Sequence, residues 1–341
     1  MNDKVWDKIL EYQTRDLVER FIKTKFNRDA SARHILEITS NFIQGREYFL
    51  NAQRAAISVK PLLLYYGVSA LTRGLILAIS PHLSEAAMKS SHGLDAVNWK
   101  EALSSKKFGD LTISIRNGTF LELLNVTSNR TYFKHNSSGV SWNINFDIPK
   151  TDAKIRFDDL VQTVSDLSDE YETWTQNKVS FFRLDTFKPI SASNEFEYVV
   201  HKDRNEENEI FNIFPKAIFG EYHREEANKK FVIRTSNKNI PQFSQRFLDA
   251  FNMGIGEIVL TKAISSETHL NTLGQLYCLS FYLGMLSRYF PSIWISLGRT
   301  EKGDAIYPLF IRIIDLVEKH FPRTVIEFLA GPYDFEKKNS D

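Results

Sequence analysis

Three residues in one apolar stretch have the types and spacing that an anion-binding site needs. Tyr66, Ser69 and Arg73 recur every three or four residues, so a helix would place them on one face. Because a guanidinium group binds a carboxylate or phosphate through two parallel donors, Arg73 is a candidate anion ligand. The competing interpretation is a structural ion pair between Arg73 and an acid on another helix, for example Glu47.

Two histidines, His82 and His92, flank a polar segment and are candidates for acid–base catalysis. An unperturbed imidazole titrates at about pH 6.5, where it can both accept and release a proton. The pair could also ligate a metal, but no nearby Asp or Cys completes a ligand set, so no metal site is predicted. The structural alternative is that His82 caps the helix ending at Pro81, while His92 and Gly93 form a turn.

The loose signature of HEPN ribonucleases, an arginine followed four to six residues later by a histidine, occurs at two places. It matches Arg28 with His34, and Arg130 with His135. That family places its arginine inside a helix, whereas Arg28 lies at a predicted helix start and Arg130 in strand-like sequence. In a strand, residues five apart point to opposite faces and lie about 16 Å apart, too far to hold one phosphate. A metal-independent ribonuclease is therefore an alternative function only.

Basic residues gather in one segment of the middle of the chain and could contact a phosphate backbone. This candidate patch consists of Lys229, Lys230, Arg234 and Lys238. Glu225 and Glu226 precede it, which favours a solvated face of mixed charge. The chain holds 43 Lys and Arg against 42 Asp and Glu, a net charge of +1. Nucleic acid is thus a possible partner but not a favoured one.

Common catalytic motifs are missing from the sequence. It contains no P-loop and no GxGxxG, HExxH or GxSxG pattern, so no cofactor is predicted and common hydrolase chemistry is disfavoured. The single cysteine, Cys278, excludes an internal disulfide and a cysteine-rich zinc site. The first residues lack the basic and apolar segments of a signal peptide. These features predict a cytoplasmic protein.

The polar face that carries Arg73 belongs to an apolar run, which predicts one buried helix over residues 61–79. Pro61 suits the first turn of a helix, Ser58 is the expected N-cap, and Pro81 ends the run. The run is long enough to span a bilayer, but Arg73 places a charge in its middle. We therefore expect the core helix of a soluble protein and no membrane partner.

Small side chains form a stripe along this predicted helix. They are Gly67, Ala70, Gly74 and Ala78. Because glycine inside a helix costs about 1 kcal/mol relative to alanine, the stripe indicates close approach of another backbone. We expect the helix to touch the one predicted over residues 267–289.

Helices at both chain ends with strand signals between them predict an α+β protein that is mainly α. The expected helices cover residues 3–26, 31–55, 95–103, 157–171, 267–289, 305–320 and 323–330. The candidate strands cover residues 111–116, 140–144, 179–187, 196–201, 210–214, 230–234 and 256–261. Asn117 and Gly118 indicate a hairpin with residues 119–126 as its return strand.

This pattern predicts a helical frame built from both chain ends around a β-containing middle. The expected parts are an N-terminal frame (1–106), an α+β middle region (107–262), a C-terminal frame (263–332) and a loose tail (333–341). No internal repeat or Gly/Ser-rich linker separates them.

Two sequence patches resemble the YaaC-like family of bacterial proteins. The first is PLLLYYGVSALTRGLILAISPH followed by HGL. The second contains Arg288, Tyr289 and Trp294, then a helix ending at His320, Phe321 and Pro322. The resemblance implies a bacterial protein but supplies no catalytic residues, because the family has no assigned function.

Together these observations favour a non-enzymatic interaction or regulatory protein of the bacterial cytoplasm, with a protein partner or a second copy of itself. The bacterial resemblance suggests stress or phage defence as its setting. The alternatives are the HEPN-like ribonuclease and a sensor that binds a small anion or nucleotide at Arg73.

Overall fold

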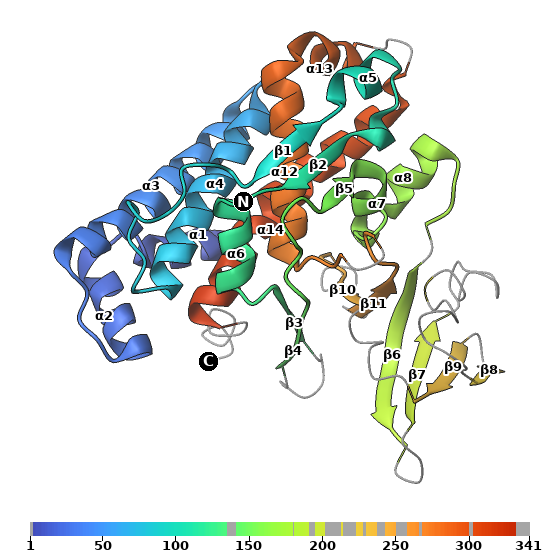
Figure 1. The fold of residues 1–341 in the computed structure, drawn as a ribbon, viewed down its shortest axis with the longest axis horizontal. Coiled ribbons are helices and arrows are strands. Elements are labelled where there is room, and N and C mark those ends of the chain that lie inside the picture. The colour runs from blue at the N-terminus through green and yellow to red at the C-terminus, as the bar shows by residue number, and fades with distance from the viewer. Residues whose placement is uncertain are drawn as a thin grey trace.

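A bundle of long helices forms the body of the computed structural model, and small sheets are attached to it (Figure 1). The structure describes residues 3–134, 141–179, 181–190, 195–201, 213, 223–227, 230–236, 243–249, 258–265, 268–299 and 303–331. Helices predominate over strands in this part of the chain, which confirms the predicted α+β, mainly α class.

The long helices come from both ends of the chain. They are α1 (Asp3–Glu11), α2 (Arg15–Phe26), α3 (Ala32–Arg54), α4 (Lys60–Ile79), α12 (Thr272–Tyr289) and α14 (Tyr307–Ala330). Shorter helices are α5 (Trp99–Ser104), α6 (Thr119–Val126), α7 (Phe157–Val161), α8 (Ser168–Thr175) and α13 (Pro291–Leu297). Single 3₁₀ turns cover Phe108–Asp110, Ser165–Leu167 and Asp304–Ile306.

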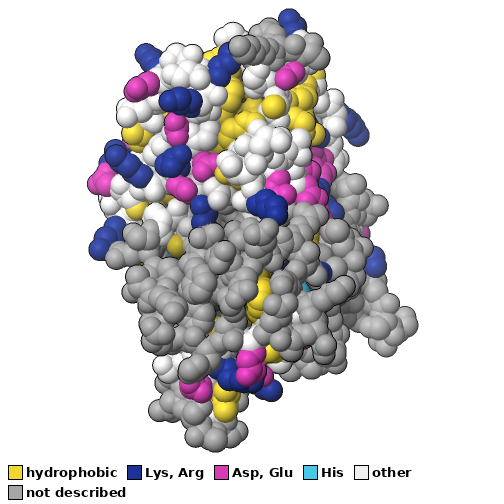
Figure 2. Space-filling model, turned by 90° about the vertical axis from the view of Figure 1, so that its right-hand side faces the viewer, with side chains coloured by type: hydrophobic (Ala, Val, Ile, Leu, Met, Phe, Trp, Pro, Cys, Tyr) yellow, Lys and Arg dark blue, Asp and Glu magenta, His cyan; other side chains and the backbone are white. Residues whose placement is uncertain are grey.

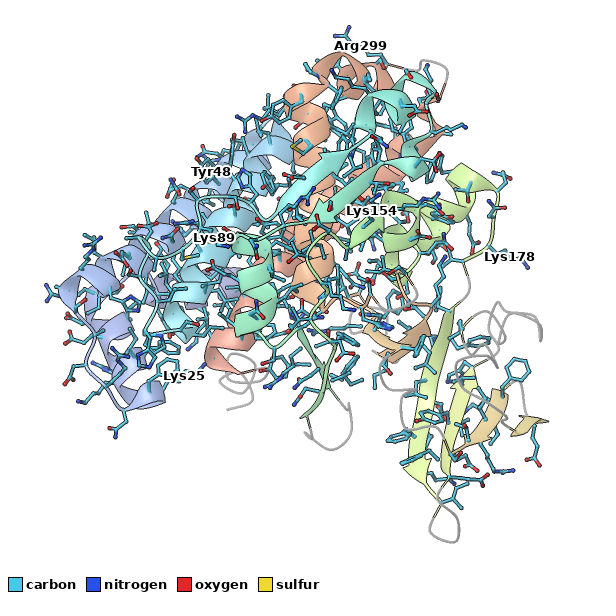
Figure 3. All side chains as sticks on the ribbon, in the orientation of Figure 1. Lys25, Tyr48, Lys89, Lys154, Lys178 and Arg299 are labelled. Atoms are coloured by element: carbon cyan, nitrogen blue, oxygen red, sulfur yellow. The ribbon has the colours of Figure 1, made fainter. Side chains whose placement is uncertain are left out.

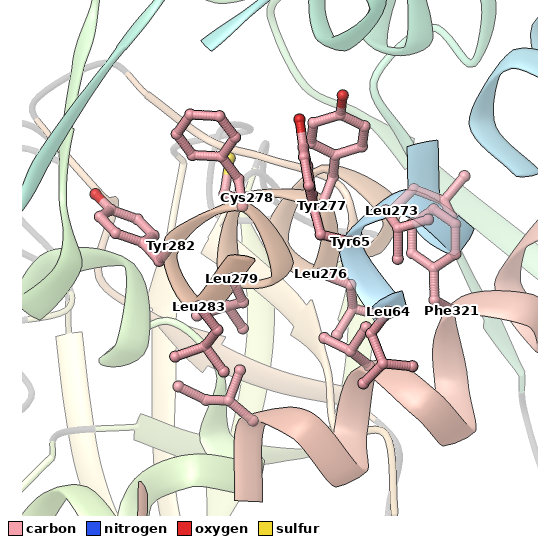
Figure 4. Packing of buried hydrophobic residues seen from close by; sticks show 14 of the residues in the cluster. Leu64, Tyr65, Leu273, Leu276, Tyr277, Cys278, Leu279, Tyr282, Leu283 and Phe321 are labelled. Atoms are coloured by element: carbon pink, nitrogen blue, oxygen red, sulfur yellow. The ribbon is translucent and has the colours of Figure 1, made fainter. Parts of the chain in front are cut away.

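Helix α4 lies at the centre of the bundle because its residues are apolar on most sides. It packs against α3, α6, α12 and α14, and Leu64, Val68, Leu71 and Leu75 are fully or almost fully buried. Leu64 and Tyr65 of α4 meet the tyrosines and leucines of α12, with Phe321 of α14 beside them (Figure 4). The predicted contact between this helix and the one near residues 267–289 is thus confirmed.

The start of α4 differs from the prediction. The helix begins at Lys60 with Val59 as its N-cap, and no side chain caps it, so the cap expected at Ser58 is wrong. Pro61 lies in the first turn as expected, where a missing backbone N–H has no cost. Among the described helices, α4 is the one long and apolar enough to cross a membrane by composition, and 67% of its most apolar window is buried inside the protein.

Three antiparallel sheets of described residues are attached to the bundle. β1 (Leu94–Val97), β2 (Thr112–Ile115) and β5 (Lys154–Arg156) form one in the order β1-β2-β5. β3 (Arg130–Lys134) pairs with β4 (Ser141–Asn145). The largest sheet has the order β10-β11-β6-β7-β9-β8. Its strands are β6 (Phe181–Pro189), β7 (Phe196–His201), β8 (His223–Ala227), β9 (Lys230–Thr235), β10 (Ser244–Arg246) and β11 (Ile258–Thr261).

The buried core of the described residues has one large cluster in the bundle and two smaller ones, on the largest sheet and at β3-β4. One continuous cluster joins α1–α4, the β1-β2-β5 sheet, α6–α8, α12 and α14. A second, smaller cluster lies on the largest sheet and includes Phe182, Tyr198 and Phe231. β6 to β9 accordingly extend away from the helical bundle (Figure 1).

The predicted hairpin at Asn117 and Gly118 is wrong, because residues 119–126 form helix α6. Phe120, Leu123 and Leu124 are all buried, a helical spacing that outweighs the turn signal. Gly118 has φ +157°, and a Cβ atom there would stand 2.7 Å from the backbone N of Gly93. Glycine is therefore needed for close approach of two segments, and β2 pairs with β1 and β5 instead.

Several boundaries also differ from the prediction. The expected helix over residues 3–26 is divided into α1 and α2, and the one over 157–171 is divided by a 3₁₀ turn. The expected helix over 95–103 is a strand followed by α5. Conversely, residues 307–330 form one helix with Pro322 inside it, where two were predicted. The strand expected at 210–214 and the tail 333–341 lie outside the described residues, apart from Ile213.

Candidate functional site

The site best supported by side-chain geometry lies where the polar face of α4 meets the loop that follows it. Arg73 Nη2 donates to Glu85 Oε1 at 3.1 Å, with side-chain exposures of 22% and 43%. Arg73 therefore does form an ion pair, but the expected partner Glu47 is wrong, since Glu47 contacts Arg46 at 3.7 Å. The loop bends back over α4 and places its own carboxylate where an external anion would bind.

Helix α3 fixes this loop. The backbone N–H of Glu85 donates to Glu37 Oε2 at 3.0 Å, and Asn41 Nδ2 donates to Glu85 Oε1 at 3.3 Å. Arg33 Nε binds the other oxygen of Glu37 at 3.0 Å. Glu37 and Asn41 are buried, so the network joins α3, α4 and the loop through groups that cannot exchange easily with water.

The other members of the predicted anion site face different neighbours. The Tyr66 ring centroid lies 5.5 Å from that of Tyr48, so this side chain packs between α3 and α4. Burial raises the pKa of Tyr277, while Ser69 and the positive charge of Arg73 oppose that rise. Ser69 thus lies beside α12, Tyr66 lies beside α3, and Arg73 contacts the loop through Glu85.

Helix α6 contributes a carboxyl group to the surroundings of Arg73. Burial raises the pKa of Glu122, and the charges of Arg73 and Lys89 lower it. Glu122 Oε2 is buried without a hydrogen-bond partner in the described structure. Glu85 and Glu122 thus place two carboxyl groups near Arg73, and an external anion would have to compete with them.

The two histidines of the predicted acid–base pair have different neighbours. Arg28 Nη1 donates to His82 Nδ1 at 2.7 Å, at the far end of α2. The His92 ring lies 5.3 Å from that of Tyr65, and burial together with the charge of Arg288 lowers the pKa of His92. In the described contacts, His82 and His92 therefore do not face each other as an acid–base pair.

The backbone of His92 has a structural role. Its carbonyl oxygen accepts the Tyr277 hydroxyl at 3.2 Å and the backbone N–H of Phe120 at 3.0 Å. This one carbonyl therefore ties the loop to α12 and to the first turn of α6.

The ribonuclease signature is not assembled within the described chain. Arg28 Nη1 contacts the His82 ring at 2.7 Å and not the His34 ring. His34 is 8% exposed, and burial, with a smaller effect from the charge of Arg28, lowers its pKa. Arg130 begins β3, as its strand-like sequence predicted, and its Nε donates to Asn145 Oδ1 at 2.8 Å. His135 lies outside the described residues.

The two described residues of the basic patch are paired with acids of the same sheet. Lys230 lies 2.9 Å from Asp185, and Arg234 lies 2.9 Å from Glu197 and 3.2 Å from Glu225. Lys229 and Lys238 lie outside the described residues. Figure 2 shows acidic and basic side chains interspersed among the coloured residues in the upper part of that view.

A buried ionic centre that no sequence pattern indicated joins the turn after β10 to α14 and to the 3₁₀ turn Ser165–Leu167. Asp249 accepts Arg312 Nη2 at 2.7 Å and His320 Nε2 at 3.1 Å, and it also binds Lys319. Asp166 accepts the backbone N–H groups of Leu248 and Asp249 at 2.9 and 2.8 Å. Asp249 is 63 residues from Arg312 and 83 residues from Asp166 in the chain, so no local spacing could have identified this centre.

The comparison with known proteins gives one match. The chain matches no curated protein and no solved structure. No group of three or more His, Cys, Asp or Glu side chains suited to a metal occurs among the described residues. A model of the YaaC-like protein family matches residues 10–329, from α1 to the last turn of α14. The chain therefore belongs to the YaaC-like family.

Proposed function

We propose that this chain is a non-enzymatic interaction protein of the bacterial cytoplasm, which binds a helix of a protein partner along the outer face of α3. The observation that carries the proposal is an apolar stripe on that face. Leu36 is 64% exposed and Ile43 is 45% exposed, seven residues further along. Leu50 continues the stripe, and Ile57 and Val59 extend it beyond the end of the helix.

Heptad spacing is the pattern by which two helices pack along a common seam. A single exposed leucine needs no explanation, but apolar residues repeated along one helix face are typical of an interaction surface. Arg33 and Arg54 lie at the two ends of the stripe; Arg33 binds Glu37 through Nε, and its side chain is still 74% exposed. The fitting partner is an amphipathic helix with an apolar stripe and acidic residues near its ends.

The state of the other candidate groups supports a binding role over catalysis. Arg73 is paired with Glu85, Lys230 and Arg234 are paired with acids, and His82 is paired with Arg28. A catalytic acid, base or nucleophile must be accessible to a substrate, and these contacts restrict access to the side chains.

The test places a photo-crosslinking amino acid at Ile43 and, as a control, at Ile148, which is 37% exposed and belongs to the segment after β4. Adducts formed in the bacterial cell are identified by mass spectrometry, and the captured protein is purified for binding measurements. We expect the Leu36→Glu/Ile43→Glu variant to lose about tenfold or more in affinity, and Ile148→Glu to bind like the wild type.

Equal binding by both variants would contradict the proposal, as would adducts from Ile148 alone. Light scattering of the purified chain tests whether the same face instead binds a second copy of the chain. A dimer that the Leu36→Glu/Ile43→Glu change dissociates would assign the face to self-association instead of a foreign partner.

A further inference from the structure

A groove opens beside α2, the helix that is followed by Arg28 and its contact with His82. It has a volume of about 740 Å³ and lies between α1, α2 and the last turn of α14. Leu17 and Phe21 of α2 and Leu329 of α14 contribute its apolar wall. Tyr12, between the two N-terminal helices, packs its ring 5.2 Å from that of Phe21. The volume falls in the range of about 300–1,000 Å³ that small-molecule sites occupy.

The groove is basic as well as apolar. Lys8, Glu11, Arg20 and Lys25 are its charged lining residues. Lys8 and Glu11 form an ion pair at 2.7 Å, so they largely cancel each other. Arg20 takes part in no ion pair within the described part of the chain, and its side chain is exposed. The remaining charge is therefore positive and comes from Arg20 and Lys25.

Lys25 is held in place by the end of α14. Its ammonium group donates to the carbonyl oxygens of Phe328 and Leu329 at 3.2 and 3.1 Å, and it lies 5.1 Å from the Phe21 ring centroid. The carboxyl end of a helix carries a partial negative charge that would repel an anion. Lys25 offsets that charge where the groove meets α14, and Figure 3 shows it at the end of α2. Burial lowers the pKa of Lys25, so a bound anion would favour its charged form.

We propose that this groove binds a small organic anion, with an apolar body against Phe21 and Leu329 and a carboxylate or phosphate group on Arg20. The apolar wall gains from excluding water, and the guanidinium supplies paired donors to the acidic group. A neutral apolar molecule would leave Arg20 unused, and inorganic phosphate would leave the wall exposed to water. This inference is independent of the interaction face on α3.

The test is isothermal titration calorimetry of the full chain with four probes. They are 2-naphthoate, 2-naphthyl phosphate, neutral 2-naphthol and inorganic phosphate. We expect both naphthyl anions to bind about tenfold more tightly than 2-naphthol or phosphate, because only they use both parts of the groove. The stronger of the two anions shows which acidic group the site prefers.

Arg20→Gln should weaken both naphthyl anions about tenfold and leave 2-naphthol unchanged. Arg15→Gln is the matched control, since Arg15 is an exposed arginine of the same helix that does not line the groove. Phe21→Leu should weaken all three naphthyl probes together. Equal affinity for 2-naphthol and the anions, equal loss in Arg15→Gln and Arg20→Gln, or no heat of binding at millimolar probe would each overturn the proposal.

Discussion

Gly284 of α12 lies directly against Tyr65 of α4. A Cβ atom added at Gly284 would stand 2.8 Å from the Cβ atom of Tyr65, closer than real side-chain atoms approach each other. The two helix backbones therefore come together at a point where one residue has no side chain. Tyr65 is 4% exposed, and its ring packs on Tyr277 and Phe281 of α12. This contact joins the helices contributed by the two ends of the chain.

Gly284→Ala should lower the free energy of unfolding by about 1–3 kcal/mol, despite alanine's better helix propensity, because the methyl group forces the two helices apart. Chemical denaturation with a circular-dichroism readout measures the change. Gly109→Ala is the control, since its Cβ would stand 3.4 Å from the nearest atom, an ordinary contact. A Gly284→Ala variant as stable as the wild type would show that α4 and α12 have room to adjust.

The sequence predicted this close packing but not where it occurs. The small-residue stripe of α4 does meet another helix, yet Gly67 and Gly74 face Phe49 and Phe42 of α3. The glycine that admits α12 lies on α12 itself. Periodicity identifies which residues of a helix share a face, whereas the partner of that face depends on packing between distant segments.

Local signals failed where a tertiary contact outweighed them. Asn117 and Gly118 have the composition of a two-residue hairpin, but the carbonyl oxygens of Ser91 and His92 accept the N–H groups of Thr119 and Phe120 at 3.0 Å each. These contacts satisfy the first turn of α6 and favour a helix there. Likewise, Glu85 could not be identified as the partner of Arg73 before the fold of the loop was known.

A double-mutant cycle should measure the Arg73–Glu85 pair at about 0.5–1 kcal/mol of coupling energy. The expected coupling is modest because the Glu85 side chain is 43% exposed and stays hydrated when Arg73 is removed. The variants are Arg73→Met, Glu85→Gln and the two combined, compared by chemical denaturation. The control cycle uses Lys23 and Asp29, a pair with side-chain exposures of 55% and 83%, and should give a smaller value. A coupling energy no larger than in this control would show that the Arg73–Glu85 ion pair does not stabilise the fold.

The Asp166 carboxyl should make stability depend on pH in an unusual direction. Burial raises the pKa of Asp166 from 3.8 to about 6, although the N–H groups of Leu248 and Asp249 and the charge of Arg312 oppose the shift. The folded chain therefore binds a proton here that the unfolded chain releases between about pH 4 and 6, so this group stabilises the fold as the pH falls through that window.

Lowering the pH from 7 to 5 should raise the free energy of unfolding of the wild type, relative to Asp166→Asn, by about 1 kcal/mol. His320, whose pKa is lowered chiefly by burial, acts in the opposite direction, but it is present in both proteins and cancels in the difference. Denaturation curves of the two proteins at pH 5, 6 and 7 provide the measurement. A difference that stays constant across these pH values would show that Asp166 remains ionised in the fold.

The last prediction is that the purified chain does not cleave RNA. A metal-independent ribonuclease needs an arginine and a histidine over one phosphate, with the imidazole free to exchange protons. His34 is 8% exposed, its Nε2 is buried without a hydrogen-bond partner in the described structure, and burial lowers its pKa. Arg28 instead binds the His82 ring at 2.7 Å.

Total RNA is incubated with the wild type, His34→Ala and His135→Ala, each with and without a chelator, and fragments are resolved by electrophoresis. We expect no difference between the three proteins and a buffer control. Cleavage by the wild type that survives chelation and disappears in either variant would replace the interaction proposal with a nuclease. Loss in His34→Ala alone would further require α3 to move, because the imidazole is enclosed in the fold described here.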